Sequence, residues 1–168
     1  MKFWVISDTH FNHDNLIEYC ARPKDHGDRL KRALFTIPDT DTLIHLGDVC
    51  IGGDAQVHED IFMKMHCRKW LVKGNHDKKS YTWYLTHGWD FVGDSIRLYI
   101  HGKYVHFSHI PNPNDYYLNV HGHLHNNDHR EALDDRCILY SPELENYQPL
   151  TLQFLISRHM HKLKELEE

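Results

Sequence analysis

The residues with the clearest chemical potential lie in short polar clusters that each follow an apolar run. The segment 73–77 reads KGNHD, so it places an amide, an imidazole and a carboxylate side by side directly after the apolar residues 70–72. Gly74 allows the backbone turn that would present these groups. Asn, His and Asp also occupy ordinary turns, so this segment alone is weak evidence of a site.

Four further clusters share this position at the end of an apolar run. They are Asp8-Thr9-His10, Gly47-Asp48, Ser108-His109 and Gly122-His123-Leu124-His125. In an extended chain, the side chains of residues two apart point to the same side, so Asp8 and His10 can bind one ion. Each cluster alone has a simpler interpretation, such as an Asx turn, but five of them in this order are hard to obtain by chance.

Together these strand-closing residues supply two carboxylates, one amide oxygen and four imidazoles. They are Asp8, His10, Asp48, Asn75, His109, His123 and His125. This set of nitrogen and oxygen ligands suits Mn²⁺, Fe, Zn²⁺ or Co²⁺ rather than Ca²⁺ or an iron–sulfur cluster. Seven ligands are too many for one ion, but two ions fit if one carboxylate bridges them. A hydroxide between ions roughly 3.5–4 Å apart can then attack a phosphorus in line.

The hydrophobic pattern indicates the elements that position these clusters. The predicted strands are 2–7, 42–46, 68–72, 95–100, 103–108, 118–121 and 137–140. The first predicted helix is capped by Asp14, runs through Leu16, Ile17 and Tyr19, and is ended by Arg22-Pro23; the others are 26–35, 56–66, 80–87 and 153–168. Strands alternate with helices over the first 75 residues, which predicts a parallel sheet with helices outside it. The second half begins with a hairpin, joined at His101-Gly102.

The composition is that of an ordinary globular chain. With 168 residues, 40% of them hydrophobic and 26% charged, we expect a single domain over 1–168. The net charge of 19 − 24 = −5 argues against a basic track, so no stable nucleic-acid partner is expected. Four cysteines without CxxC or scaffold spacing indicate a reducing compartment, the cytoplasm. The opening apolar run is too short for a signal peptide or a membrane span.

Histidine is the outlier, at 17 of 168 residues, and not every one belongs to a cluster. His45 lies within a predicted strand and His106 within the hairpin, so both are interpreted as structural. The histidines expected to be solvated are His58, His66, His87, His159 and His161. The role of His121 stays open.

The pattern DxH, GD, GNHD, H and GHxH, which spans residues 8–125, resembles that of the calcineurin-like metallophosphoesterases. The opening SDTHFNH of residues 7–13 and the CARP of residues 20–23 are similar to the small, capless bacterial and phage members. The resemblance implies an α/β (α+β) sandwich of two mixed β-sheets packed together and flanked by helices. It implies that one metal is held by Asp8, His10, Asp48 and His125. It implies that the other is held by Asp48, Asn75, His109 and His123, with Asp48 as the bridge.

The same resemblance suggests the residues that act on the substrate. His76 would lie off the metals near the leaving group, with Asp77 orienting it. His13 would lie near the site, although a helix-entry residue is the simpler interpretation. Arg22 is a candidate for clamping a phosphate oxygen because guanidinium matches that geometry, the alternative being an exposed arginine at a helix end. About 40 residues separate Asp8 from Asp48, and we expect this insertion to shape substrate choice.

We therefore predict a dinuclear metal-dependent phosphoesterase that hydrolyses a small or nucleotide-type phosphodiester. It would use two divalent transition-metal ions, with Mn²⁺ favoured and Fe, Zn²⁺, Co²⁺ and Ni²⁺ as alternatives. A phosphomonoesterase at the same site is the first alternative. A protein-interaction scaffold with a vestigial site is the second. It is disfavoured because no ligand, nor the off-metal histidine, is replaced by an apolar residue. A DNA nuclease is disfavoured by the net charge and the lack of a capping domain.

Overall fold

The computed structural model describes residues 1–113, 116–127 and 134–167 of the 168-residue chain. In chain order its elements are β1 (Phe3–Ile6), α1 (Leu16–Tyr19), α2 (His26–Leu34), β2 (Thr42–His45), α3 (Asp54–Val57), the π-helical turn η1 (His58–Phe62), β3 (Arg68–Val72), α4 (Tyr81–Thr86), β4 (Phe91–Gly93), β5 (Ser95–Ile100), β6 (Lys103–Ser108), β7 (Leu118–His121), β8 (Cys137–Leu139), β9 (Leu150–Thr151) and α5 (Leu152–Glu167).

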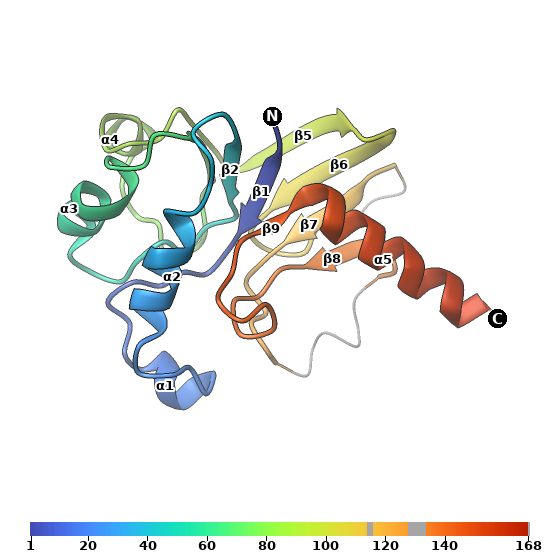
Figure 1. Cartoon of the computed structure of the whole chain (residues 1–168), viewed down its shortest axis with the longest axis horizontal. Helices are drawn as coiled ribbons and strands as arrows, with labels where there is room; N and C mark the ends of the chain where they lie inside the picture. The colour runs from blue at the N-terminus through green and yellow to red at the C-terminus, as the bar shows by residue number, and fades with distance from the viewer. Residues whose placement is uncertain (114–115, 128–133, 168) are drawn as a thin grey trace.

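The first sheet has the strand order β4-β3-β2-β1-β9. Strands β1 to β4 run parallel, as the alternation of strands and helices predicted, whereas β9 pairs antiparallel with β1. Strand β2 lies inside the sheet and is buried along its whole length, because helices cover one face of the sheet and the second sheet covers the other (Figure 1). Figure 1 shows α2, α3 and α4 gathered on the side of this sheet that faces away from the second sheet.

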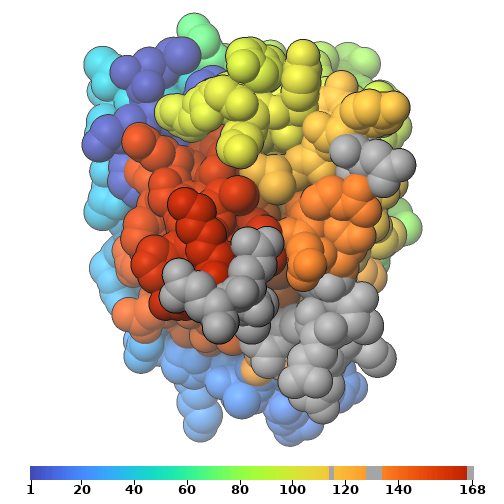
Figure 2. All heavy atoms as spheres, turned by 90° about the vertical axis from the view of Figure 1, so that its right-hand side faces the viewer, coloured from blue at the N-terminus to red at the C-terminus, as the bar shows by residue number. Residues whose placement is uncertain are grey.

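The second sheet has the strand order β5-β6-β7-β8. Strands β5 and β6 form the predicted antiparallel hairpin, and β6, β7 and β8 run parallel. Helix α5 contacts β1, β9 and β8, and it lies on the outside of the molecule (red in Figure 2). One hydrophobic core joins both sheets, with Val5 and Leu71 from the first and Phe107 and Val120 from the second. The predicted architecture of two mixed sheets flanked by helices is confirmed.

The single helix predicted over 56–66 is instead a short α-helix followed by the π-helical turn η1. The amide of Met63 donates to the carbonyl of His58 across that wider turn, at 2.8 Å. Val57, Ile61 and Met65 still face inward and are buried, as the spacing predicted.

The prediction that His58 is solvated was wrong, since this side chain is fully buried. Its ring packs against Trp83 and Tyr84, with ring centroids 5.0 and 5.6 Å away. Its Nδ1 atom lies 2.8 Å from the carbonyl oxygen of Asp54, one helical turn earlier. An apolar pattern does not reveal this position, because the aromatic partners come from α4.

Two short strands, β4 and β9, were not predicted, because two or three residues carry too little periodicity. Both lie at the edges of the first sheet. Within the described residues, no helix combines the length and apolar character needed to cross a membrane.

Candidate metal centre

The parallel strands of the first sheet carry three of the polar clusters to one edge. Asp8 follows β1, Asp48 follows β2 and Asn75 follows β3, and these strands are neighbours in register. The loops after β1 and β2 continue side by side. The amide of Asp8 donates to the carbonyl of Gly47 at 2.9 Å, and that of His10 donates to the carbonyl of Asp48 at 3.0 Å. The carboxyl ends of parallel strands are the usual place for chemistry in such sheets.

The second sheet brings the remaining two clusters to the same place. His109 follows β6, and His123 and His125 follow the parallel strand β7. The amide of Gly122 donates to the carbonyl of His109 at 3.0 Å. The amide of His123 donates to Oδ2 of Asp8 at 2.9 Å, which ties the edges of the two sheets together.

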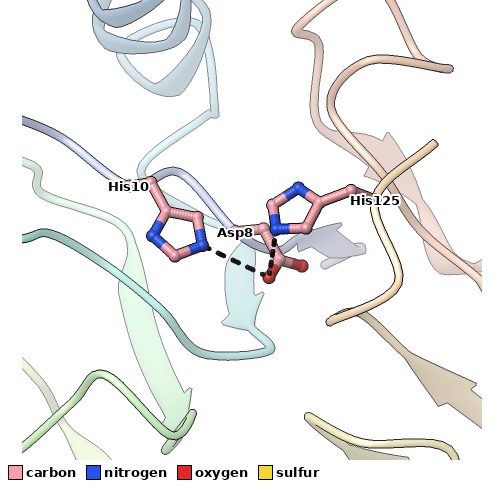
Figure 3. A group of neighbouring side chains, drawn as sticks. All are labelled: Asp8, His10 and His125. Atoms are coloured by element: carbon pink, nitrogen blue, oxygen red, sulfur yellow. Dashed lines mark ion pairs between the residues drawn. The ribbon is translucent and has the colours of Figure 1, made fainter. Parts of the chain in front are cut away.

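The first ligand group consists of Asp8, His10 and His125, whose ligand atoms all lie within 4.8 Å of one another. Nε2 of His10 and Nε2 of His125 each lie 3.7 Å from Oδ1 of Asp8. Figure 3 shows both imidazoles turned toward this carboxylate, and their rings are stacked with centroids 5.3 Å apart. The structure thus brings together three of the four residues expected to hold one metal.

The second ligand group consists of Asp48, His109 and His123, again within 4.8 Å. Nε2 of His109 lies 3.3 Å from Oδ2 of Asp48, 3.1 Å from Nδ1 of His123 and 2.9 Å from Oδ1 of Asn75. All four residues expected around the other metal therefore meet at one point.

Asp48 lies between the two groups. Its Oδ2 atom is 3.5 Å from Nε2 of His10 and 3.3 Å from Nε2 of His109. Its Oδ1 atom accepts a hydrogen bond from the amide of His76 at 2.8 Å. One oxygen thus faces both groups while the other is held by the backbone.

Five of the seven expected ligands have left-handed backbone conformations, which are uncommon for residues other than glycine. They are Asp8 (φ 51°), His10 (φ 45°), Asp48 (φ 57°), His123 (φ 71°) and His125 (φ 49°). Two glycines let these loops approach closely. A Cβ atom at Gly74 would collide with the carboxylate of Asp48, and one at Gly122 with Ser7 and the carboxylate of Asp8. Such concentrated backbone strain points to a functional site.

The orientation of His109 makes the second group suitable for a cation. Its Nδ1 atom lies 2.8 Å from the carbonyl oxygen of Leu46, which can only accept, so Nδ1 carries the hydrogen. In the neutral ring, the Nε2 lone pair then faces the oxygens of Asp48 and Asn75. Lone pairs that converge in this way require either a proton or a metal ion between them.

The first group shows the same need for a cation. Oδ1 of Asp8 is buried and has no hydrogen-bond partner in the described part of the chain. A buried carboxylate oxygen without a partner is costly, and a metal ion would satisfy it. The donors of both groups are carboxylate, amide and imidazole, so they fit divalent first-row transition metals.

Burial and neighbouring charges set the protonation of these groups. Burial lowers the pKa of His10 to about 2, so its ring is neutral. Burial acts to raise the pKa of Asp48, but hydrogen bonding and charge from His109 hold it at about 2. Burial acts to lower the pKa of His109, but Asp48 and Asp8 raise it to about 9. A metal entering the second group must therefore displace a proton from His109.

His76 lies at the open side of the site. Its side chain is 43% exposed, and Nε2 is 4.0 Å from Oδ2 of Asp48. Its ring centroid is 5.4 Å from that of His10. His13 is also brought to this side, with its ring 5.4 Å from His10 and 6.5 Å from His76.

Asp77 does not hold the ring of His76 through its carboxylate, contrary to the prediction. Its Oδ2 accepts hydrogen bonds from the amides of Asp48 and Gly74, both at 2.8 Å, and its Oδ1 accepts one from Val49 at 3.1 Å. The buried carboxylate instead fastens the loop after β3 to the loop after β2.

The prediction that Arg22 clamps a phosphate oxygen disagrees with the structure, because its guanidinium is fully buried. Nη1 and Nη2 donate to the carbonyls of Thr9 and Asp8 at 3.1 and 2.7 Å, and Nε donates to Glu143 at 2.7 Å. All three nitrogens are engaged within the protein, so none faces a substrate.

Glu143 was missed by the sequence analysis. Its Oε1 lies 3.0 Å from Nδ1 of His125 as well as 2.7 Å from Arg22. Burial acts to raise its pKa, but His125 and Arg22 hold it at about 2.

Cys20 lies close enough to form a third group with His125 and Glu143, but the carboxylate of Glu143 is already occupied by its hydrogen bonds. The sequence offered one indication of Glu143, namely its position just beyond the predicted strand 137–140, because the residues of the other clusters also follow strands.

His45 and His106 are buried, as expected of structural histidines. The amide of Gly47 donates to Nδ1 of His45 at 3.1 Å, and Nε2 lies 3.0 Å from the hydroxyl of Thr9. Thr9 in turn donates to the carbonyl of Val49 at 2.8 Å. Through these hydrogen bonds, His45 connects the loop after β1 with the loop after β2.

Comparison with known proteins gives one family. The family model described as calcineurin-like phosphoesterase matches residues 1–159. The uncharacterised protein MJ1445 of Methanocaldococcus jannaschii is 29% identical over 171 residues, with 92% of this chain and 89% of that protein covered.

Two solved structures are similar in fold. The protein of unknown function AQ665 from Aquifex aeolicus gives a TM-score of 0.73 at 26% identity, with 96% of this chain and 98% of that chain covered. An archaeal phosphodiesterase gives a TM-score of 0.53 at 19% identity, with 84% of this chain and 83% of that chain covered. At 19% identity, the likeness concerns the fold alone.

Proposed function

This chain belongs to the calcineurin-like phosphoesterase family, and we propose that it is a dinuclear metal-dependent phosphodiesterase. The observation that carries the proposal is the position of Asp48, whose Oδ2 atom lies within 3.5 Å of a histidine from each ligand group. A carboxylate in that place suits a pair of cations that share it.

In this proposal, Asp8, His10, Asp48 and His125 hold one divalent ion. Asp48, Asn75, His109 and His123 hold the other. When bound, such a pair lowers the pKa of water and neutralises the charge of phosphoryl oxygens. Mn²⁺ is favoured, and Fe, Zn²⁺, Co²⁺ and Ni²⁺ are alternatives with the same ligand preference.

The remaining residues of the site act on the substrate. The exposed imidazole of His76 can give a proton to the departing ester oxygen, as general acids of this type do. Its backbone is held by the bond to Asp48, so the ring is placed without a second side-chain partner. His13 lies on the same open side, where we propose that it contacts the substrate.

We favour a diester of nucleotide type over a monoester for two reasons. A diester carries one negative charge on phosphorus, so a nucleophile approaches it more easily than a dianionic monoester. A cavity of about 550 Å³ beside the second ligand group offers room for the second ester substituent. Its lining includes Lys73, Asn75, His106, His109, Ile110 and Asn112.

The test is a side-by-side assay of an aryl phosphodiester and the matching monoester with the same metal. We expect the diester to have the larger kcat/KM, because an open site depends on metals and leaving group rather than on remote binding energy. Asp48→Asn serves as the control for contaminating phosphatase. A clear preference for the monoester would instead make the protein a phosphomonoesterase.

We propose that the protein acts in the cytoplasm on a small phosphoester and has no stable nucleic-acid partner. All four cysteines are free and buried, which suits a reducing compartment. The net charge of −5 does not favour a broad contact with a nucleic-acid backbone.

A further inference from the structure

A buried ion pair joins two segments that are 121 residues apart. Nε of Arg22 lies 2.7 Å from Oε1 of Glu143, and the two side chains are 0% and 4% exposed. Buried ion pairs contribute little net stability, because the charges lose their hydration. The pair therefore calls for a role beyond holding the fold together.

Glu143 fixes the ring of a proposed metal ligand. Its Oε1 atom lies 3.0 Å from Nδ1 of His125, and its Oε2 atom accepts a hydrogen bond from Ser141. The carboxylate can only accept, so Nδ1 of His125 carries the hydrogen. In the neutral ring, the free lone pair is then on Nε2, the atom that lies 3.7 Å from Asp8.

Arg22 holds the other two members of the first ligand group through the backbone. It donates to the carbonyls of Asp8 and Thr9, the two residues that precede His10. Asp8 and His10 both have left-handed backbone conformations, with φ of 51° and 45°. Strained conformations persist only where the surroundings hold them.

The second ligand group has a different support. His109 is braced by the carbonyl of Leu46, and Asp48 by the amide of His76. Among the hydrogen bonds of the described residues, none joins Asp48, His109 or His123 to Arg22 or Glu143. The ion pair therefore supports the first ligand group directly, whereas it reaches the second only through Asp8 and His10, which hydrogen-bond to His123 and Asp48.

We propose that Arg22 and Glu143 are positioning residues that set the affinity of the metal site formed by Asp8, His10 and His125, separately from the site around His109. Glu143 selects the ring nitrogen that His125 offers, and Arg22 fixes the backbone that presents Asp8 and His10. The assignment rests on the proposed dinuclear centre. Partners of this kind typically change metal affinity by about 10–100-fold.

The first test measures Mn²⁺ binding by equilibrium dialysis with elemental analysis. Wild-type protein is compared with Glu143→Gln, which keeps the shape but removes the charge. We expect one of two bound ions to weaken by about 10–100-fold while the other stays within about threefold. Glu145→Gln is the matched control, since Glu145 lies two residues away, pairs with Arg158 outside both ligand groups and should leave both ions unchanged. Unchanged binding in Glu143→Gln, or equal weakening of both ions, would overturn the proposal.

The second test needs no variant, so it holds even if Glu143→Gln folds poorly. The ¹⁵N chemical shifts of the His125 ring in metal-free wild-type protein report its tautomer at a pH where the ring is neutral. We expect hydrogen on Nδ1, and hydrogen on Nε2 would contradict the role of Glu143. A wild-type chain that binds no Mn²⁺ would overturn the proposed function and this assignment together. Two ions in wild type with an unaffected variant would overturn this assignment alone.

Discussion

At the scale of single residues, backbone amides organise the site as much as side chains do. Asp77 accepts three amide hydrogen bonds and so joins the loops after β2 and β3. Asp48 is anchored by the amide of His76, not by its ring. The ring of His76 is therefore free to act on a substrate, and its removal leaves the anchor in place.

His76→Ala should consequently separate catalysis from metal binding. We expect metal occupancy near that of wild type, because the amide that holds Asp48 remains. Turnover should fall by about 10²–10⁴, the usual contribution of a general acid. Steady-state kinetics on an alkyl diester and elemental analysis of the same sample measure both quantities.

The loss in that variant should be larger for diesters with alkoxide leaving groups than for aryl diesters, which need less protonation. The control is His66→Ala, which replaces an exposed histidine outside the site and should leave both quantities unchanged. An empty metal site in His76→Ala would mean that its ring is a ligand.

At the scale of elements, the site exists because both sheets end their parallel strands at one edge. Strands β1, β2 and β3 supply the loops of the first sheet, and β6 and β7 those of the second. The bond from the amide of His123 to Asp8 joins the two edges. Outside the site, the π-helical turn η1 buries His58 against two aromatic rings of α4.

That burial makes stability depend on pH in a defined direction. Burial lowers the pKa of His58 from 6.5 to about 4 in the folded protein. Because the folded state excludes the proton, the stability associated with a neutral His58 is fully present above pH 6.5 and declines as the pH falls toward 4. At pH 5 the loss relative to neutral pH is about 2 kcal/mol.

His58→Phe should remove this dependence while keeping a ring in the aromatic cluster. Between pH 7 and pH 5, we expect the variant to lose about 2 kcal/mol less unfolding free energy than wild type. Urea unfolding in the presence of a chelator measures this without a contribution from metal. His66→Phe, at an exposed position, should behave like wild type, and an equal loss in His58→Phe and wild type would contradict the assignment.

At the scale of the whole molecule, one hydrophobic core joins the two sheets, and the ligands of each group come from both. The first group takes Asp8 from the first sheet and His125 from the second. Such a site forms only when the sheets are packed together, so bound metal stabilises the folded chain. The cavity of about 550 Å³ lies beside the second group, on the surface formed by both sheets.

Local sequence patterns were enough to single out the side chains that the structure brings together, because each lies within four residues of the end of a strand. The hydrophobic pattern, and the glycines and polar residues that interrupt it, indicate where β1, β2, β3, β6 and β7 end. The sheet then fixes the position of the polar residue that follows each strand. Because neighbouring strands are parallel, the residues that follow them meet in one cluster although they lie far apart in the sequence.

The supporting residues could not be assigned in the same way, because their partners are distant in sequence. Arg22 was expected to face the substrate, but Glu143, 121 residues later, turns it into the interior. Glu143 carries no motif of its own. Asp77 was assigned to its neighbour His76, whereas its hydrogen bonds run to the next loop. These roles depend on contacts between residues that are distant in sequence, and the hydrophobic periodicity of the sequence does not reveal such contacts.

The central claim is a pair of metal ions that share Asp48, and a Mn²⁺ titration tests it most directly. With seven ligands in two groups, the wild-type chain should bind about two ions, counted by elemental analysis after dialysis against saturating Mn²⁺. Asp48→Asn should weaken both ions at once, because the shared charge is lost. One ion or none in wild type, or two tightly bound ions in Asp48→Asn, would contradict the account.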